Sequence, residues 1–325
     1  MLARPFIALA AIAAALSVAQ AQQAQMQDYP NRPITLVVPY AAGGGNDVMA
    51  RIVGEKMSKT LGQQVVIDNR AGAGGALATR QVAKAAPDGY TLVIGGTGSL
   101  AVNPTLLPNV GYDVRKDFAP VGMIGSSAMI VITHPSIPAN NIAELIALAK
   151  KEPDKYTYAS AGVGSGIHLG AELFAYMGGI KLVHVPYKGT GPALTDLLGA
   201  HVSMYFSSLP SAIGLVKEGK VRALAVTGSK RSDVFPDVPT VAETLPGFEA
   251  VLRYGIVAPA GTPRPIIDKL NAALRQALAE PDVIARMARD GTDSVSSTPE
   301  EYAADIDREE RKWSEVVKRS GAVAK

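Results

Sequence analysis

The sequence predicts an α/β fold with a parallel sheet, and three observations support this. Strand-like and helix-like segments alternate through most of the 325 residues. Hydrophobic residues make up 47% and aromatic residues 6% of the chain, which is usual for a globular α/β protein. A chain of about 300 residues is longer than one hydrophobic core usually spans, so two domains are expected.

The first strands and helices follow the order βαβαβ, which predicts parallel strands covered by helices on both faces. Glycine after the first helix (Gly62) and the turn 87–89 after the second are ordinary helix-end signals. The first helix carries apolar residues at the spacing of a buried face. The predicted strands are 34–38, 64–68 and 90–95, the helices are 46–61 and 75–86, and the apolar residues are Met49, Ile52, Val53 and Met57.

A second series of strands and helices begins after Asp117. Asn141 can cap a helix, and Glu144 stands at the capping-box spacing from it. The predicted strands are 121–124, 129–133, 156–160, 181–185, 204–207, 223–227 and 254–258, with helices at 167–177, 192–198 and 210–216. The chain then becomes helical over 265–280, 281–289 and 299–320, the last with Tyr302, Ile306, Trp313 and Val317 on one stripe.

Residues 1–21 are predicted to be a cleaved signal peptide. Arg4 supplies the positive charge, 7–18 form the apolar core, and Ala19-Gln20-Ala21 is a small-x-small cleavage site. The apolar run is too short to span a membrane, and no later segment approaches the ~20 apolar residues required. We therefore expect a periplasmic protein without a membrane anchor.

Composition narrows the function further. The chain has no cysteine, which excludes disulfides, thiol catalysis, thiolate metal sites and a lipid-modified cysteine. Its formal net charge of +3 is too small to indicate a nucleic-acid partner. The four histidines show no metal-binding spacing, so neither a metal nor a cofactor is expected.

Four glycine-rich turns follow predicted strands, at 41–46, 72–75, 95–98 and 162–166. The first, within Pro39–Arg51, is the most informative segment of the chain because it leads from a strand into a helix. Free backbone N–H groups and the positive end of the helix dipole make such a turn a ready anion site. Open α/β sheets bind ligands at the carboxyl ends of their strands, where these turns lie.

No nucleotide or hydrolase motif accompanies these turns. None has the Gly-x-Gly-x-x-Gly or the phosphate-loop spacing. Gly162-Val-Gly-Ser165-Gly misses the spacing of a nucleophile elbow, and no pair of carboxylates stands out for acid–base work. We expect a binding protein, not an enzyme, with no catalytic residues.

Three residues near the turns have two interpretations each. His168, at a predicted helix start, could contact a ligand or simply pack there. Lys188 could pair with a carboxylate, although a surface lysine beside a turn favours a solvated role. Asp47 suits the dipole of the first helix, and a local capping role is the favoured interpretation.

Motifs across nearly the whole mature chain place it in a known family. The chain resembles the periplasmic substrate-binding proteins of tripartite tricarboxylate transporters, also called the Bug family. The matching stretches, in family order, are Tyr29–Ile34, Val38–Asp47, Asp68–Gly75, Pro87–Leu92, Asp113–Pro120, Val185–Gly189, Pro236–Glu243 and Ala258–Pro263.

The resemblance implies a type II periplasmic-binding-protein fold, in which two α/β lobes are joined by two crossovers with a ligand cleft between them. Lobe one would be 28–125 plus 253–325, and lobe two 126–252. The crossovers would lie near Gly125 and Tyr254. Such hinges absorb backbone rotation while each lobe stays rigid.

The resemblance also implies a function and a site. The ligand would be a small organic carboxylate, a di- or tricarboxylate or an amino acid, captured by a monomer and delivered to a membrane permease. The alternative is a sensing subunit that presents the carboxylate to a membrane sensor such as a sensor kinase. The implied ligand contacts are Tyr40, Ala41, Ala42, Gly43, Gly44, Asn46, Asp47, Thr97, Gly98, Ser99, Ser160, Gly164, Ser165, Gly166, His168 and Ser207.

One residue departs from the family pattern. Arg253 stands where an aromatic residue, typically tryptophan, is expected. Arg253 would pair with a distal carboxylate if it faces the cleft, and would have no such role if it faces away.

Overall fold

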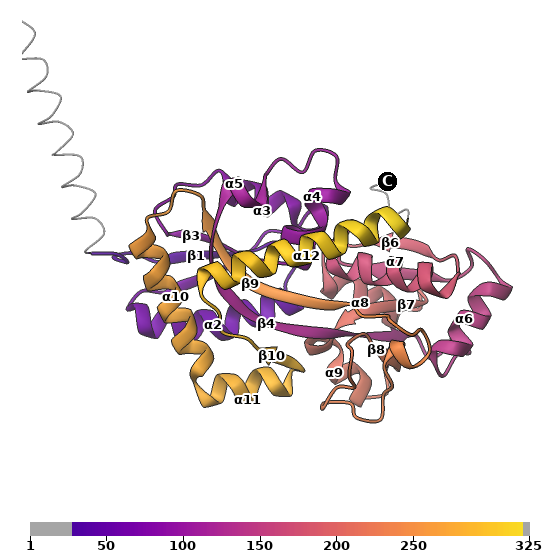
Figure 1. Ribbon diagram of the computed structural model, residues 1–325. Coiled ribbons are helices and arrows are strands. Elements are labelled where there is room, and N and C mark those ends of the chain that lie inside the picture. Colours follow the sequence, from indigo (N-terminus) through magenta and orange to yellow (C-terminus); the bar gives the residue numbers. More distant parts are fainter. Residues whose placement is uncertain (1–27, 321–325) are drawn as a thin grey trace, which may run out of the picture.

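The computed structural model describes residues 28–320, which form one mixed sheet flanked by helices (Figure 1). The predicted signal peptide, residues 1–21, lies outside the described residues. Within 28–320 no helix is both long enough and apolar enough to cross a bilayer.

Ten strands build the sheet, in the order β2-β1-β3-β9-β4-β7-β5-β6, and β8 and β10 also pair with β4. β1 is parallel to β2 and β3, and β5 is parallel to β6 and β7, whereas the pairs β3–β9, β9–β4 and β4–β7 are antiparallel. The strands are β1 Ile34–Val38, β2 Val65–Asn69, β3 Thr91–Gly96, β4 Phe118–Thr133, β5 Thr157–Ser160, β6 Val183–Pro186, β7 Met204–Ser208, β8 Arg222–Val226, β9 Val251–Pro259 and β10 Thr292–Ser294.

The two long central strands, β4 and β9, join the two parallel groups. The first part of β4 pairs with β9, and its last five residues pair with β7. The prediction of two separate strands, at 121–124 and 129–133, is therefore wrong, because β4 runs unbroken from one group to the other. Gly125 and Tyr254, the predicted crossover positions, are register partners in this pair. We call the part around β1–β3 lobe one and the part around β5–β8 lobe two; the residue boundaries between them remain a prediction.

The long helices agree with the predicted segments to within a few residues. The short helical segments η2, α4 and α5 and the strand β10 were not anticipated. The helices are α2 Gly45–Leu61, α3 Ala76–Ala83, α4 Asn103–Leu106, α5 Val114–Asp117, α6 Ile142–Lys151, α7 Gly166–Gly178, α8 Thr190–Leu198, α9 Leu209–Lys217, α10 Arg264–Ala279, α11 Pro281–Arg289 and α12 Pro299–Ser320, with short turns η1 Ala73–Gly75, η2 Thr97–Val102 and η3 Val241–Glu243.

Local sequence signals account for these helices. The Asn141 side chain accepts a hydrogen bond from the Glu144 amide at 2.8 Å, as its capping position predicts. The Glu144 carboxylate returns to the Asn140 amide at 2.8 Å, one residue before the expected one. The predicted apolar faces of α2 and α12 are both buried in the core.

The last helix, α12, lies across the sheet and reaches from lobe one to lobe two (Figure 1). It packs on η2 and β4 and also contacts α7 of lobe two. Arg253 of β9 fixes its position, because the guanidinium pairs with Asp305 at 2.9 Å and with Glu309 at 3.0 Å. The two carboxylates are only 8% and 6% exposed, so they depend on this partner.

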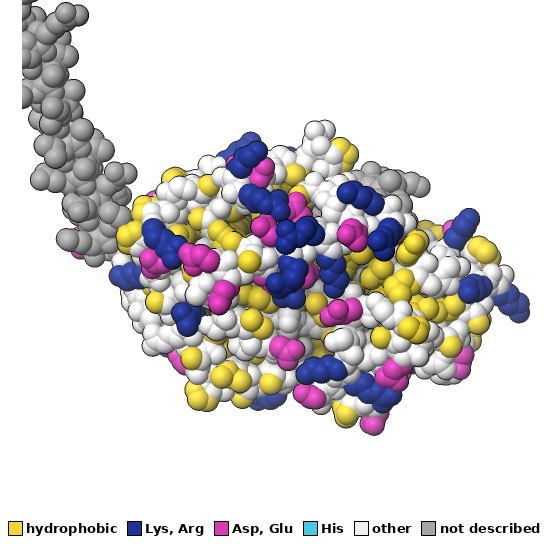
Figure 2. Space-filling model, in the orientation of Figure 1, with side chains coloured by type: hydrophobic (Ala, Val, Ile, Leu, Met, Phe, Trp, Pro, Cys, Tyr) yellow, Lys and Arg dark blue, Asp and Glu magenta, His cyan; other side chains and the backbone are white. Residues whose placement is uncertain are grey.

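Charged side chains of both signs are interspersed over the face that carries α12 (Figure 2). This mixture agrees with the small net charge of the chain. A broad basic stripe, which marks a nucleic-acid footprint, is absent from this face of the described residues.

Replacing Arg253 by methionine should destabilise the protein by about 3 kcal/mol, because the buried carboxylates of Asp305 and Glu309 lose the one guanidinium that pairs with both. Urea unfolding measures this change. Arg308→Met is the matched control, since Arg308 also pairs with Asp305 but is 60% exposed. The control should cost less than about 1 kcal/mol. Equal losses for the two variants would contradict a structural role for Arg253.

Candidate functional site

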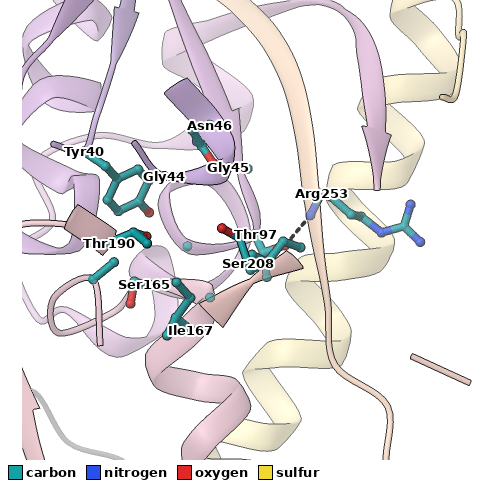
Figure 3. Close-up of a pocket in the computed structure, with 15 residues that line it drawn as sticks. Tyr40, Gly44, Gly45, Asn46, Thr97, Ser165, Ile167, Thr190, Ser208 and Arg253 are labelled. Atoms are coloured by element: carbon teal, nitrogen blue, oxygen red, sulfur yellow. Dashed lines mark hydrogen bonds between the residues drawn. The ribbon is translucent and has the colours of Figure 1, made fainter. Parts of the chain in front are cut away.

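A cavity lies between the two lobes, beside β9, one of the two strands that join them (Figure 3). The free space there amounts to about 430 Å³, part of which is open to solvent. Its lining residues come from both lobes. They are Tyr40, Gly44, Gly45, Asn46, Gly96, Thr97, Gly98, Ala161, Ser165, Gly166, Ile167, Thr190, Ser208, Leu252 and Arg253.

Two long helices begin at this cavity from opposite lobes. The first backbone bond of α2 runs from Val48 N to Gly44 O, so the amides of residues 45–47 have no partner within the helix. In α7, the Ser165 hydroxyl accepts from His168 N at 3.2 Å, which leaves the amides of Gly166 and Ile167 for a ligand. Both positive dipole ends therefore meet at one place.

Two further helices of lobe two also start at the cavity wall. Thr190 is the first residue of α8, and Ser208 is the N-cap of α9. The Thr190 hydroxyl accepts from the Tyr205 hydroxyl at 2.9 Å, so the proton of Thr190 can be donated toward the cavity. Four helix N-termini and a set of hydroxyl groups thus surround the space, an arrangement that favours an anion.

Charged side chains near the cavity are already paired. Burial alone would raise the pKa of Asp47, but hydrogen bonds from Arg51 and from the Gly43 backbone outweigh it and lower the pKa. The Gly43 amide donates to the Asp47 carboxylate at 3.0 Å, which is the local role favoured by the sequence. Lys188 is exposed and outside the lining, also in agreement with its favoured interpretation.

Arg253 borders the cavity, but its guanidinium turns away toward α12 (Figure 3). Its backbone amide donates to the Thr97 hydroxyl at 3.0 Å. The structure thus answers the question that the sequence left open. Arg253 serves the attachment of α12 to β9, and its charge is not directed at the cavity.

The lobes meet along a seam in which their backbones touch. Ala41 N donates to Lys188 O at 3.2 Å, and the Ser211 hydroxyl donates to Gly43 O at 2.7 Å. Gly74 has a φ of +57°, and a Cβ there would collide with the carbonyl oxygen of Val163. Glycine is needed at this seam because only a residue without a side chain permits such close approach.

The structure divides the predicted ligand contacts into three groups. Those that line the cavity are Tyr40, Gly44, Asn46, Thr97, Gly98, Ser165 and Gly166. Those that belong to the seam are Ala41, Ala42, Gly43 and Gly164. Those whose polar side chains are engaged within the protein, outside the lining, are Asp47, Ser99, Ser160, His168 and Ser207.

Sequence reasoning missed several lining residues, above all Thr190 and Ser208. Both follow predicted strands and precede predicted helices, so the rule that located the other contacts could have found them. Neither turn contains a glycine run: 186–191 has two separated glycines, and 208–210 has a proline and no glycine. Leu252 had no signal, because it lies inside a strand and reaches the cavity only through the tertiary fold.

Comparison with known proteins identifies the family. The model of the "Tripartite tricarboxylate transporter family receptor" matches residues 49–322. The chain belongs to this family. Protein BugT of Bordetella pertussis is 39% identical over 322 residues, covering 98% of this chain and 96% of BugT.

Two family structures with bound carboxylates are close to this one. Rpa4515 of R. palustris with adipate is 35% identical with a TM-score of 0.88, covering 91% of this chain and 99% of Rpa4515. MatC from Rhodopseudomonas palustris with bound malate is 37% identical with a TM-score of 0.86, covering 89% of this chain and 100% of MatC. The structure is also similar to that of the periplasmic binding protein BugD, which is 39% identical with a TM-score of 0.88, covering 91% of this chain and 100% of BugD.

A stack of aromatic rings supports the lobe-two wall of this family fold. The rings of His168 and His184 lie 4.2 Å apart, and Tyr158 stacks on His184 at 4.8 Å. His168 Nδ1 accepts from the Gly164 amide at 3.3 Å, so it must be unprotonated. Burial, followed by the neighbouring His184, lowers the pKa of His168 to about 3, and burial lowers the pKa of His184 to about 4.

The stack predicts a loss of stability in acid. A histidine whose pKa is lowered by folding stabilises the protein above its unfolded pKa of about 6.5, and this contribution is lost as the pH falls toward its folded pKa. At pH 5 the loss for His168 is about 2 kcal/mol relative to pH 7.5. Glu172, whose Oε1 is 3.9 Å from His168 Nε2, is the nearest charged group.

Urea unfolding of the wild type and of His168→Gln at pH 7.5 and 5.0 measures this contribution. The variant should lose about 2 kcal/mol less than the wild type between the two pH values. His134→Gln, which replaces a half-buried histidine outside the stack, controls for the loss of a histidine elsewhere. Parallel pH dependence in wild type and His168→Gln would contradict the role of the stack.

Proposed function

We propose that this protein is a periplasmic binding protein that captures a small organic carboxylate and delivers it to the membrane permease of a tripartite tricarboxylate transporter. The ligand would be a di- or tricarboxylate or an amino acid. The observation that carries the proposal is the convergence of helix N-termini from both lobes on one cavity. The family and the adipate and malate in related structures support a carboxylate over other anions.

Recognition by amides and hydroxyls explains how the site works without a cationic clamp. Unpaired amides of α2 and α7 face each other across the cavity, so each can take one end of a dicarboxylate. Groups that the amides do not reach can be bridged by ordered water, which is nearly as favourable enthalpically as a direct hydrogen bond. In this proposal Arg253 contributes to the hinge and leaves the anion to the backbone.

Closure of the lobes would complete the site. Contact along the seam reduces the exposure of the cavity to bulk water, and the lower local dielectric would strengthen each hydrogen bond to the anion. β4 and β9, the two strands that join the lobes, would absorb the rotation. The permease would then distinguish the loaded, closed protein from the empty, open one.

Calorimetric titration of ligand-stripped protein with succinate, malate, adipate, citrate and aspartate tests the proposal. At least one carboxylate should bind, and at ~100-fold excess over Kd it should stabilise the protein by about 2.7 kcal/mol. Succinamide and sulfate are the controls for chain shape and for general anion binding. No response to any carboxylate, or a response equalled by sulfate, would contradict the proposal.

The seam predicts that Gly74→Ala weakens ligand binding by at least about tenfold, or 1.4 kcal/mol, because a Cβ there obstructs closure. Gly179→Ala is a matched control, since Gly179 has a φ of +59° and open space around it. Both variants should lose about 1 kcal/mol of stability from the left-handed conformation. Only Gly74→Ala should lose affinity in calorimetry. Equal affinities in the two variants would show that the seam does not govern binding.

A further inference from the structure

Tyr254 of the hinge strand β9 holds a buried hydroxyl group that has no hydrogen-bond partner within the described residues. The side chain is 1% exposed. Buried polar groups are nearly always hydrogen-bonded, so an unpartnered one calls for an explanation. An unused donor close to a binding cavity is a candidate for a ligand contact.

The hydroxyl lies directly behind the wall of the cavity. A Cβ on Gly45 would collide with the Tyr254 hydroxyl oxygen and would stand 3.2 Å from the Cβ of Ser208. Gly45 and Ser208 both line the cavity, one from each lobe. Glycine at 45 is therefore what allows the hydroxyl to approach the start of α2.

Two neighbouring tyrosines, Tyr40 and Tyr205, have hydroxyl groups that donate hydrogen bonds within the protein. The Tyr40 hydroxyl donates to Gly74 O at 3.1 Å, and the Tyr205 hydroxyl donates to the Thr190 hydroxyl at 2.9 Å. Both of these tyrosines have an acceptor that the protein supplies. Tyr254 lies near both of them, but it has no such acceptor.

The Tyr254 hydroxyl is available as a donor. Burial, with smaller contributions from Tyr205 and Tyr40, raises the pKa of Tyr254, so the hydroxyl keeps its proton. The free backbone groups around it at the start of α2 are amide N–H groups, which are also donors. The described residues thus supply no acceptor, which leaves the hydroxyl free for one that enters with the ligand.

We infer that the Tyr254 hydroxyl donates a hydrogen bond to a carboxylate oxygen of the ligand, directly or through one water that the ligand holds. This inference rests on the proposed function and adds a side-chain determinant to recognition by the backbone. The donor sits on the hinge strand and beside both lobes, so its hydrogen bond forms only when the ligand is in place. Because the hydroxyl is a donor, it favours a carboxylate oxygen over an ammonium group at this point of the cavity.

Tyr254→Phe removes the one oxygen atom and keeps the ring. The ligand-stripped variant should melt at the same temperature as the wild type or higher, because an unsatisfied buried donor is gone. Its affinity for the carboxylate that the wild type binds most tightly should fall by about tenfold or more. Thermal unfolding and calorimetry measure the two effects.

Tyr29→Phe is the matched control. Tyr29 is similarly buried and does not line the cavity, and its hydroxyl donates to Gly89 O at 2.8 Å. This variant should melt at a lower temperature and bind the carboxylate with unchanged affinity. Tyr254→Phe should therefore lower the affinity without lowering the melting temperature, whereas Tyr29→Phe should lower the melting temperature without changing the affinity.

Unchanged carboxylate affinity in Tyr254→Phe would overturn the inference and leave the proposed function standing. A lower melting temperature of the stripped Tyr254→Phe protein would also overturn it, since the hydroxyl would then have a partner within the protein. A wild-type protein that binds no carboxylate would overturn both the inference and the proposed function.

Discussion

The close approach of two backbones along the seam is the constraint on which the rest of the structure depends. Gly74 lies against the Val163 carbonyl, and a Cβ on Gly98 would stand 3.0 Å from Gly164 O. Because neither position carries a side chain, the lobes come near enough for the N-termini of α2 and α7 to share one cavity. Each of these N-termini alone is an ordinary helix start. Together, the unpaired backbone amides of the two helices form one set of hydrogen-bond donors around the cavity.

The connection between the lobes has a separate physical basis. β4 and β9 are the strands that carry the chain between the lobes, and α12 lies across them. The ion pairs of Arg253 with Asp305 and Glu309 join β9 to α12, and the carboxylates are buried enough to require that partner. On the same strand, the next residue, Tyr254, directs its hydroxyl toward the cavity wall. β9 thus attaches α12 through Arg253 and presents the unpartnered hydroxyl of Tyr254 toward the cavity wall.

Local sequence patterns predicted most of the fold, because helix caps, apolar stripes and glycine turns are decided by neighbours in the chain. The same reasoning picked out the glycine-rich turns 41–46 and 162–166, and the family resemblance then implied ligand contacts there, of which Tyr40, Gly44, Asn46, Ser165 and Gly166 line the cavity. It could not predict that Gly74 meets Val163, that Arg253 turns to α12, or that Ser160 and His168 are engaged behind the wall. Those contacts join residues from different elements, and only the tertiary packing brings them together.

A crystal structure of the protein with a bound carboxylate tests the central claim most directly. The account predicts carboxylate oxygens within hydrogen-bond distance, or one water, of backbone amides at the start of α2 and at the start of α7, with the lobes in contact along the seam. A carboxylate bound outside this cavity, or held by one lobe while the seam stays open, would contradict it.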